Sequence, residues 1–164
     1  MRIKMAASAA MVAAIAATGI APASAGSDIP NREKWADRYL SAVCPANAAA
    51  DKRADAWEQA FDGRNRVKFG TPMPRYLRKA FHRESVAYAR AGMKFARWDW
   101  PTELQRPAAR MARGFYKSST VAQHRAEKTR VSRGWGRPVK FGASARTMRI
   151  ALELPPPGAK RDGC

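Results

Sequence analysis

The sequence predicts an all-α protein, a small antiparallel bundle of four to five helices with one disulfide. Three observations predict this fold. Apolar side chains recur at helical spacing along most of the chain, and no segment competes with the alternating pattern of a β-strand. The amphipathic segments are joined by short connections, which favour antiparallel neighbours. A chain of 164 residues normally forms one domain with an apolar core.

Residues 1–25 are expected to be a secretory signal peptide. The chain opens MRIK, continues without a charge through MAASAAMVAAIAATGIAP, and reaches a small-residue cleavage site after Ala25. The alternative is a retained membrane anchor, but the stretch is near the lower length limit for a span and is mostly weakly apolar alanine. We therefore expect an exported protein, secreted or held at the cell envelope, with a helical domain over 26–154 and a tail over 155–164.

The two cysteines of the chain are Cys44 and Cys164. Two cysteines in an exported chain most simply form a disulfide, with two free thiols as the alternative. Closing a loop of this length stabilises the folded state by roughly 5 kcal/mol in the chain-entropy model. Two Cys and two His at no recognised spacing are too few for a metal site, so no metal and no cofactor is expected.

Two helices are predicted before residue 64. The first covers 31–43, with Asn31 as its N-cap, and places four apolar residues on one face: Trp35, Tyr39, Leu40 and Val43. Pro45 is expected to end this helix and to begin the next, because proline suits a first turn. Cys44 then lies at the corner of a helical hairpin. The second helix carries an apolar stripe and ends at Gly63; the stripe is Ala50, Ala54, Trp57 and Phe61.

The third predicted helix covers residues 74–98. Its apolar sector contains Leu77, Phe81, Tyr88, Ala91 and Phe95, and its opposite side contains Arg75, Lys79, Arg83, Arg90, Lys94 and Arg97. Glu84 projects from the middle of the apolar sector. A buried general acid or base is one interpretation, and a carboxylate paired with an arginine from a neighbouring helix is the commoner one.

A fourth helix is predicted from Pro101, followed by a last one over 144–154. The fourth has one apolar and one basic face, formed by Leu104, Ala108, Met111 and Phe115 and by Arg106, Arg110, Arg113 and Lys117. Pro107 predicts a kink or a late start. Beyond Ser118 the periodicity fades into a short helix and a basic, glycine-containing loop. The last helix contributes Ala145, Met148 and Leu152 to the core.

Three segments carry a resemblance to a known group of proteins. YLSAVCPANAA, WDWPTEL and MRIALELPPPG, the last near a C-terminal cysteine, resemble small exported or lipid-anchored helical proteins of actinobacteria. The resemblance implies a Cys44–Cys164 pair and a helical bundle at the cell envelope, and it brings no catalytic residue. This chain departs from the pattern in its high positive charge, in Pro107 and in lacking a cysteine for lipid attachment.

No local motif predicts an enzyme, although a site assembled in three dimensions stays open. Only His82 and His124 supply imidazole, both among basic residues, and a solvated surface histidine is the expected state of His82. The chain has no H-E-x-x-H motif, nucleophile elbow, phosphate-binding loop or dinucleotide fingerprint. We expect a non-catalytic protein.

The charge distribution is the remaining functional signal. The formal charge is +18, and residues 63–164 contain twenty-four Lys or Arg against six Asp or Glu. Such a surface attracts polyanions, which for an exported protein are anionic lipid headgroups or cell-wall polymers. A merely solvated arginine-rich surface is the open alternative. The predicted polyanion-binding residues are Arg75, Lys79, Arg83, Arg90, Arg106, Arg110, Arg113, Lys117, Arg130, Arg133 and Arg137.

The second functional hypothesis is a secreted cationic effector that acts on membranes or binds nucleic acid. Trp98, Trp100 and Trp135 lie near basic residues, which suits interfacial insertion or base stacking. Against it, the apolar sectors of the helices are needed for the core.

Overall fold

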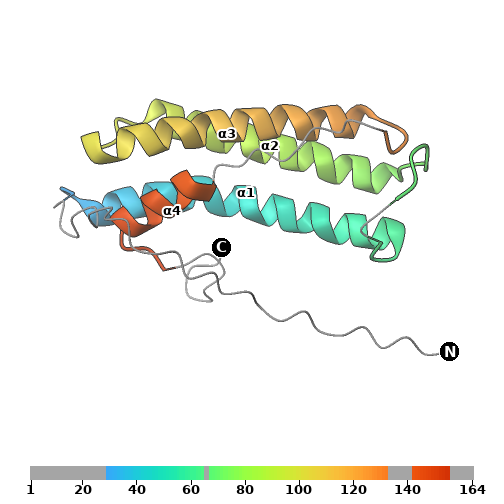
Figure 1. Ribbon diagram of the computed structural model, residues 1–164, viewed down its shortest axis with the longest axis horizontal. Coiled ribbons are helices and arrows are strands. Elements are labelled where there is room, and N and C mark those ends of the chain that lie inside the picture. The colour runs from blue at the N-terminus through green and yellow to red at the C-terminus, as the bar shows by residue number, and fades with distance from the viewer. Residues whose placement is uncertain (1–28, 65–66, 133–141, 156–164) are drawn as a thin grey trace, which may run out of the picture.

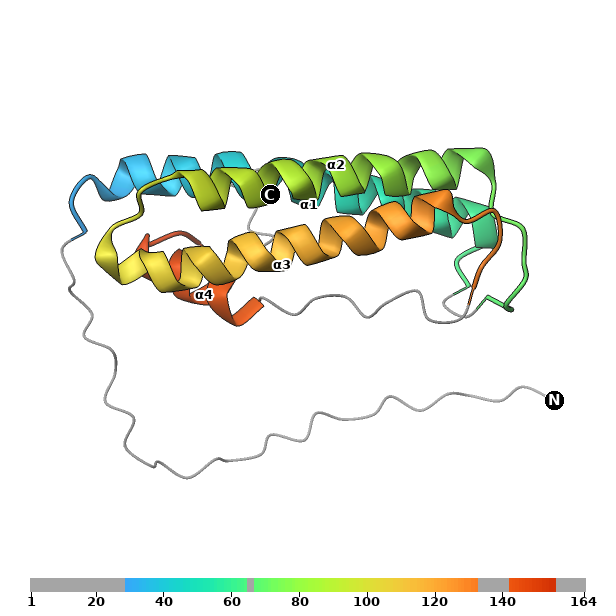
Figure 2. The same cartoon turned by 90° about the horizontal axis from the view of Figure 1, so that it is seen from above.

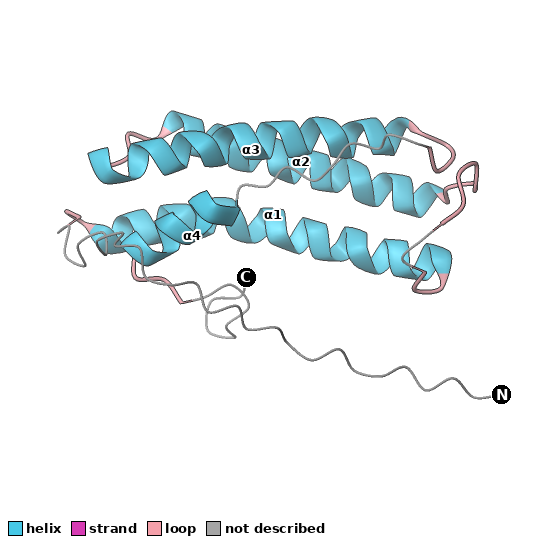
Figure 3. Ribbon diagram, in the orientation of Figure 1, coloured by secondary structure: helices cyan, strands magenta, loops and turns pink. Residues whose placement is uncertain are grey.

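The computed structural model describes residues 29–64, 67–132 and 142–155. These parts of the chain contain four helices and no strand (Figure 3): α1 Arg32–Phe61, α2 Arg75–Arg97, α3 Thr102–Glu127 and α4 Gly142–Ala151. The first three helices run alternately in opposite directions beside one another, as two perpendicular views show (Figures 1 and 2). The short α4 packs against α3. The prediction of an all-α protein is confirmed.

The first two predicted helices are one continuous helix. α1 passes through Pro45 without a break, so the prediction that Pro45 ends a helix is wrong. The predicted hairpin with Cys44 at its corner is wrong for the same reason, because Cys44 lies half-buried inside α1. Cys164, the signal segment 1–25 and most of the predicted tail lie outside the described residues.

A contact from α2 explains why α1 tolerates Pro45. Proline has no backbone N–H, so the carbonyl of Ser41, four residues earlier, loses its helical donor. The Lys94 ammonium of α2 donates a hydrogen bond to that carbonyl, with Nζ and O 2.7 Å apart. An interhelical bond thus replaces the missing intrahelical one.

The remaining helices agree with the periodicity, with differences at the boundaries. α2 occupies Arg75–Arg97, close to the predicted range. α3 begins at Thr102 and continues to Glu127, so Pro107 lies buried inside the helix and does not delay its start. The helix therefore extends well beyond Ser118, where the apolar period fades. In α4 the predicted core residue Met148 is fully buried.

The core consists of two apolar clusters along the bundle. The larger lies where α1 begins and α2 ends, and it contains Tyr39, Phe95, Trp100, Leu104, Met111, Phe115 and Met148 among others. Its rings pack closely, with the centroids of Phe95 and Trp100 5.4 Å apart in a stacked arrangement. The smaller cluster lies near the opposite end and contains Phe61, Met73, Leu77, Phe81 and Val131. Trp100 is therefore a core residue, which removes it from the predicted interfacial tryptophans.

α2 and α3 approach closely at Gly92. A Cβ added there would lie 3.3 Å from the Ala112 carbonyl oxygen and 3.3 Å from the Tyr116 ring. Such a separation is tighter than ordinary van der Waals contact, so the absence of a side chain at Gly92 lets the two helices pack at this distance.

The role of Lys94 predicts an energetic coupling to Pro45. Lys94→Met should lower the free energy of unfolding by about 1–2 kcal/mol, because the Ser41 carbonyl loses its donor. In a Pro45→Ala background the cost should fall to less than half, since the introduced alanine supplies the helical N–H. Urea unfolding of the double-mutant cycle measures the coupling, with Lys79→Met as an exposed control on the same helix. An equal cost of Lys94→Met in both backgrounds would contradict this account.

Candidate functional site

A buried carboxylate lies between the two apolar clusters. Glu84 projects from the inner face of α2 and is 3% exposed. Arg53 of α1 approaches it, with Nε 3.3 Å from Oε1, and the Tyr88 hydroxyl donates a hydrogen bond to the same oxygen at 3.1 Å. The interpretation of Glu84 as the partner of an arginine from a neighbouring helix is confirmed.

The environment of this cluster shifts two further groups. Burial raises the pKa of the Tyr88 phenol, and the Glu84 charge adds to the rise, so the phenol stays protonated and remains a donor. Burial lowers the pKa of the Arg125 guanidinium of α3; the Glu84 charge opposes this shift and the Arg53 charge adds to it. Arg125 still carries its charge at neutral pH, because a guanidinium is not deprotonated in proteins. Charged or polar groups of three helices therefore surround Glu84.

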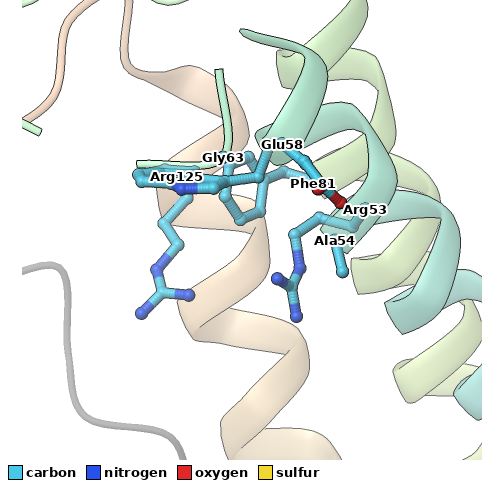
Figure 4. A pocket seen from close by; sticks show the side chains of 7 residues that line it. Arg53, Ala54, Glu58, Gly63, Phe81 and Arg125 are labelled. Carbon is cyan, nitrogen blue, oxygen red and sulfur yellow. The ribbon is translucent and has the colours of Figure 1, made fainter. Parts of the chain in front are cut away.

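An open cavity of about 550 Å³ adjoins this cluster. Figure 4 shows the Arg53 and Arg125 guanidinium groups extending side by side in the same direction, from different helices. The cavity is lined by Arg53, Ala54, Trp57, Glu58, Gly63, Phe81 and Arg125. The Arg125 guanidinium carbon lies 5.8 Å from the centroid of the Phe81 ring, within cation–π range. We call this the arginine cavity. Its chemistry suits a negatively charged group rather than proton transfer.

The α2–α3 contact beside the cluster is polar. The Ser119 hydroxyl donates to the Ser85 carbonyl at 2.9 Å, and the exposed His82 ring lies 3.1 Å, Nδ1 to Oε1, from Gln123. His124 is also exposed. The expectation of a surface histidine at His82 is thus confirmed, and the hydrogen bond to Gln123 ties it to α3.

The structure describes nine of the eleven predicted polyanion-binding residues, and all nine are exposed: Arg75, Lys79, Arg83, Arg90, Arg106, Arg110, Arg113, Lys117 and Arg130. Arg133 and Arg137 lie outside the described residues. Within the described parts of the chain none of the nine makes an ion pair. Arg130 donates to the Gly70 carbonyl at 2.8 Å.

The nine residues gather only in part. Arg90 and Arg97 line one surface hollow together with Trp98, and Arg113 lines a neighbouring hollow that shares Trp98. These basic groups therefore meet near the turn between α2 and α3. Arg75 and Lys79 line another hollow, near the start of α2. The nine residues therefore do not share a single concavity.

Sequence reasoning did not single out Arg53 or Arg125. A signal for them was present, because a carboxylate in an apolar sector requires a cation from another element. The sequence contains many arginines, and their spacing does not show which of them would face Glu84. Sequence reasoning also missed Arg149, which is 5% exposed. Its Nε donates to the Pro155 carbonyl at 2.7 Å, and its guanidinium lies over the Tyr39 ring.

No protein-family model, no curated protein and no solved structure matches this chain. The described parts define an all-α bundle. None of its helices combines the length and the apolar character that a membrane span requires. Among the described residues, no three His, Cys, Asp or Glu side chains are placed to hold a metal ion together.

The raised pKa of Tyr88 predicts an alkaline loss of stability. A phenol whose pKa is higher in the folded state contributes its full stabilisation of the fold below its unfolded-state pKa of about 10. This contribution is lost progressively as the pH rises from there through the folded-state pKa. Tyr88→Phe should therefore reduce the decline of unfolding free energy by about 1.4 kcal/mol per pH unit above roughly pH 10. Urea unfolding from about pH 9 to about pH 11 measures it.

The control is Tyr76→Phe at an exposed tyrosine, which should leave the pH slope as it is. Tyr39, whose pKa burial also raises, accounts for a part of the decline that remains in Tyr88→Phe. The same slope in the wild type and in Tyr88→Phe would refute the assignment.

Proposed function

We propose that this chain is an exported, non-catalytic protein of the cell envelope that binds anionic surface groups through α2 and α3. The observation that carries the proposal is the set of nine exposed cations without an ion pair in the described residues. Along α2 the single acidic residue is Glu84, which is buried. The exposed cations of α2 therefore have no exposed acidic residue on their own helix, and they are accessible to anionic lipid headgroups or wall polymers.

The proposal includes export and one disulfide. The apolar N-terminal segment supports export, and an oxidising compartment favours pairing of Cys44 with Cys164. Cys44 lies in the middle of α1, so the pair would fix the chain terminus to the longest helix of the bundle.

A second candidate is a cationic effector that disrupts membranes. Met93 and Tyr116 are 44% and 41% exposed, and the hollows that they line also contain Arg97 and Arg113. Apolar and basic groups side by side suit an interfacial surface. The buried Trp100 weakens this candidate, because its indole N–H is bonded to the Phe95 carbonyl in the core.

The binding proposal predicts a dependence on salt and on one helix face. The protein should bind vesicles that contain phosphatidylglycerol and a soluble anionic wall polymer, but not neutral vesicles, with affinity falling as salt rises. The triple substitution Arg106→Gln, Arg110→Gln and Arg113→Gln should weaken binding roughly a hundredfold, at about 1 kcal/mol for each residue. Co-sedimentation and fluorescence titration over a salt series measure this.

The matched control is Lys34→Gln, Lys52→Gln and Arg64→Gln, which removes the same charge from exposed positions on and after α1. Equal weakening by both triples would show that net charge alone acts, against a role for α3. No binding at physiological salt would overturn the proposal. Leakage of vesicle contents would favour the second candidate.

The disulfide predicts a chain without free thiols. Mass spectrometry of the exported protein, alkylated without reductant, should find neither sulfur modified and a peptide that joins Cys44 to Cys164. Cys44→Ser and Cys164→Ser should each lower stability by up to roughly 5 kcal/mol, because either change removes the same crosslink. Alkylation of both sulfurs would refute the pairing.

A further inference from the structure

The arginine cavity brings guanidinium groups from two helices to one space. Arg53 comes from α1, Arg125 comes from α3, and Phe81 of α2 lies between them (Figure 4). A volume of about 550 Å³ falls within the usual range for small-molecule sites, roughly 300–1,000 Å³. The cavity is thus large enough for a compact ligand.

The hydrogen bond of Arg53 leaves donors for such a ligand. Arg53 approaches Glu84 through Nε, and within the described residues this is the hydrogen bond that it makes. Its two Nη nitrogens therefore stay available on the cavity side. A guanidinium offers its N–H groups in a fixed fork, which matches the paired oxygens of a carboxylate or phosphate.

The wall of the cavity holds Arg125 in place and supplies apolar surface. The Arg125 guanidinium lies over the ring of Phe81. Phe81 is 1% exposed and is therefore fixed in the core. The half-buried Trp57 adds a second ring, packed edge-on against Phe61 with centroids 4.7 Å apart. An anionic group at the arginines would thus place the rest of a small ligand against aromatic surface.

The charges around the cavity favour an anion. Arg53, Arg125 and the buried Glu84 together carry one net positive charge. Glu58, also on the lining, is exposed, so solvent screens its charge more than that of the buried Glu84. Burial lowers the pKa of Arg125, the Glu84 charge opposes this shift and the Arg53 charge adds to it by a smaller amount. A bound anion would add a second negative charge beside the two cations.

We infer that the arginine cavity binds the carboxylate or phosphate group of a small molecule that has a compact apolar or aromatic body. Arg53 and Arg125 would hold the anionic group, Trp57 would contact the body, and the buried Phe81 would support Arg125. Glu84 fixes Arg53 and limits the positive charge of the site. This site is separate from the exposed cations of α2 and α3, and it does not rest on their proposed function.

Phenyl phosphate and benzoate are the probes, with phenol as the uncharged match, and calorimetric titration of the full chain at constant ionic strength measures affinity. Both anions, or one of them, should bind more tightly than phenol, and the tighter one identifies phosphate or carboxylate as the natural group. Arg125→Gln should weaken binding of that anion at least about tenfold, because a charge-assisted pair is lost. Arg146→Gln, an exposed control on α4 outside the cavity, should leave it within about twofold.

Glu84→Gln provides a test of opposite sign. The amide oxygen still accepts from Arg53 and Tyr88, but the negative charge is gone, so the probe anion should bind about tenfold more tightly. A merely structural role of the cluster predicts weaker binding in this variant. Equal binding by Arg125→Gln and Arg146→Gln, phenol binding as tight as both anions, or weaker binding by Glu84→Gln would each overturn the inference.

The two proposals fail separately. Polyanion binding is tested by the exposed triple on α3, which contains no lining residue of the arginine cavity. If Arg125→Gln lost small-anion binding and the α3 triple left vesicle binding unchanged, the cavity alone would be supported. If the α3 triple weakened vesicle binding and Arg125→Gln left small-anion binding unchanged, the surface alone would be supported.

Discussion

The buried carboxylate of Glu84 is the constraint on which the arrangement of the three long helices depends. An ionised carboxylate removed from water costs several kcal/mol unless it is paired and hydrogen-bonded. Here the compensation comes from Arg53 on α1 and Tyr88 on α2. The pair is satisfied at one axial position of α1 against α2, so a shift of either helix by a turn would leave the carboxylate unpartnered. Apolar contacts alone tolerate such a shift more readily.

This polar cluster also divides the core. On α2 the side chains of Leu77 and Phe81 belong to one apolar cluster, and those of Ala91 and Phe95 belong to the other. Glu84 lies between them in sequence and on the same face. α2 thus contacts both of the other long helices, through the buried ion pair toward α1 and through the close approach at Gly92 toward α3. The central helix determines the geometry that places Arg53 and Arg125 in one cavity.

The apolar periodicity predicted the buried faces of the helices, which depend on local sequence. Sequence-based prediction failed where the structure depends on a residue far away in the chain. The inner face of α2 and that of α3 follow from the 3.6-residue repeat, because burial of one face is what makes such a helix stable. The expectation that Pro45 ends one helix and begins the next rests on the preference of proline for a first turn, which is a correct local argument. Lys94, far away in sequence, supplies the bond that Pro45 cannot. Likewise, Glu84 indicates that a cationic partner is needed, but which arginine faces it depends on helix packing. Arg53 and Arg125 come together only in three dimensions.

The exposed cations destabilise the folded state, and the buried core must compensate for this. Unpaired surface cations repel one another, and a large net charge destabilises the compact state. Since the nine exposed cations make no ion pair in the described residues, the apolar clusters and the Glu84 cluster must offset that repulsion. Added salt then acts in two directions: it screens the repulsion and stabilises the fold, and it screens attraction to an anionic surface. The buried ion pair is screened much less, so the arrangement around Glu84 persists at ionic strengths that screen the exposed cations. Salt should therefore weaken the proposed polyanion binding before it loosens the arginine cavity.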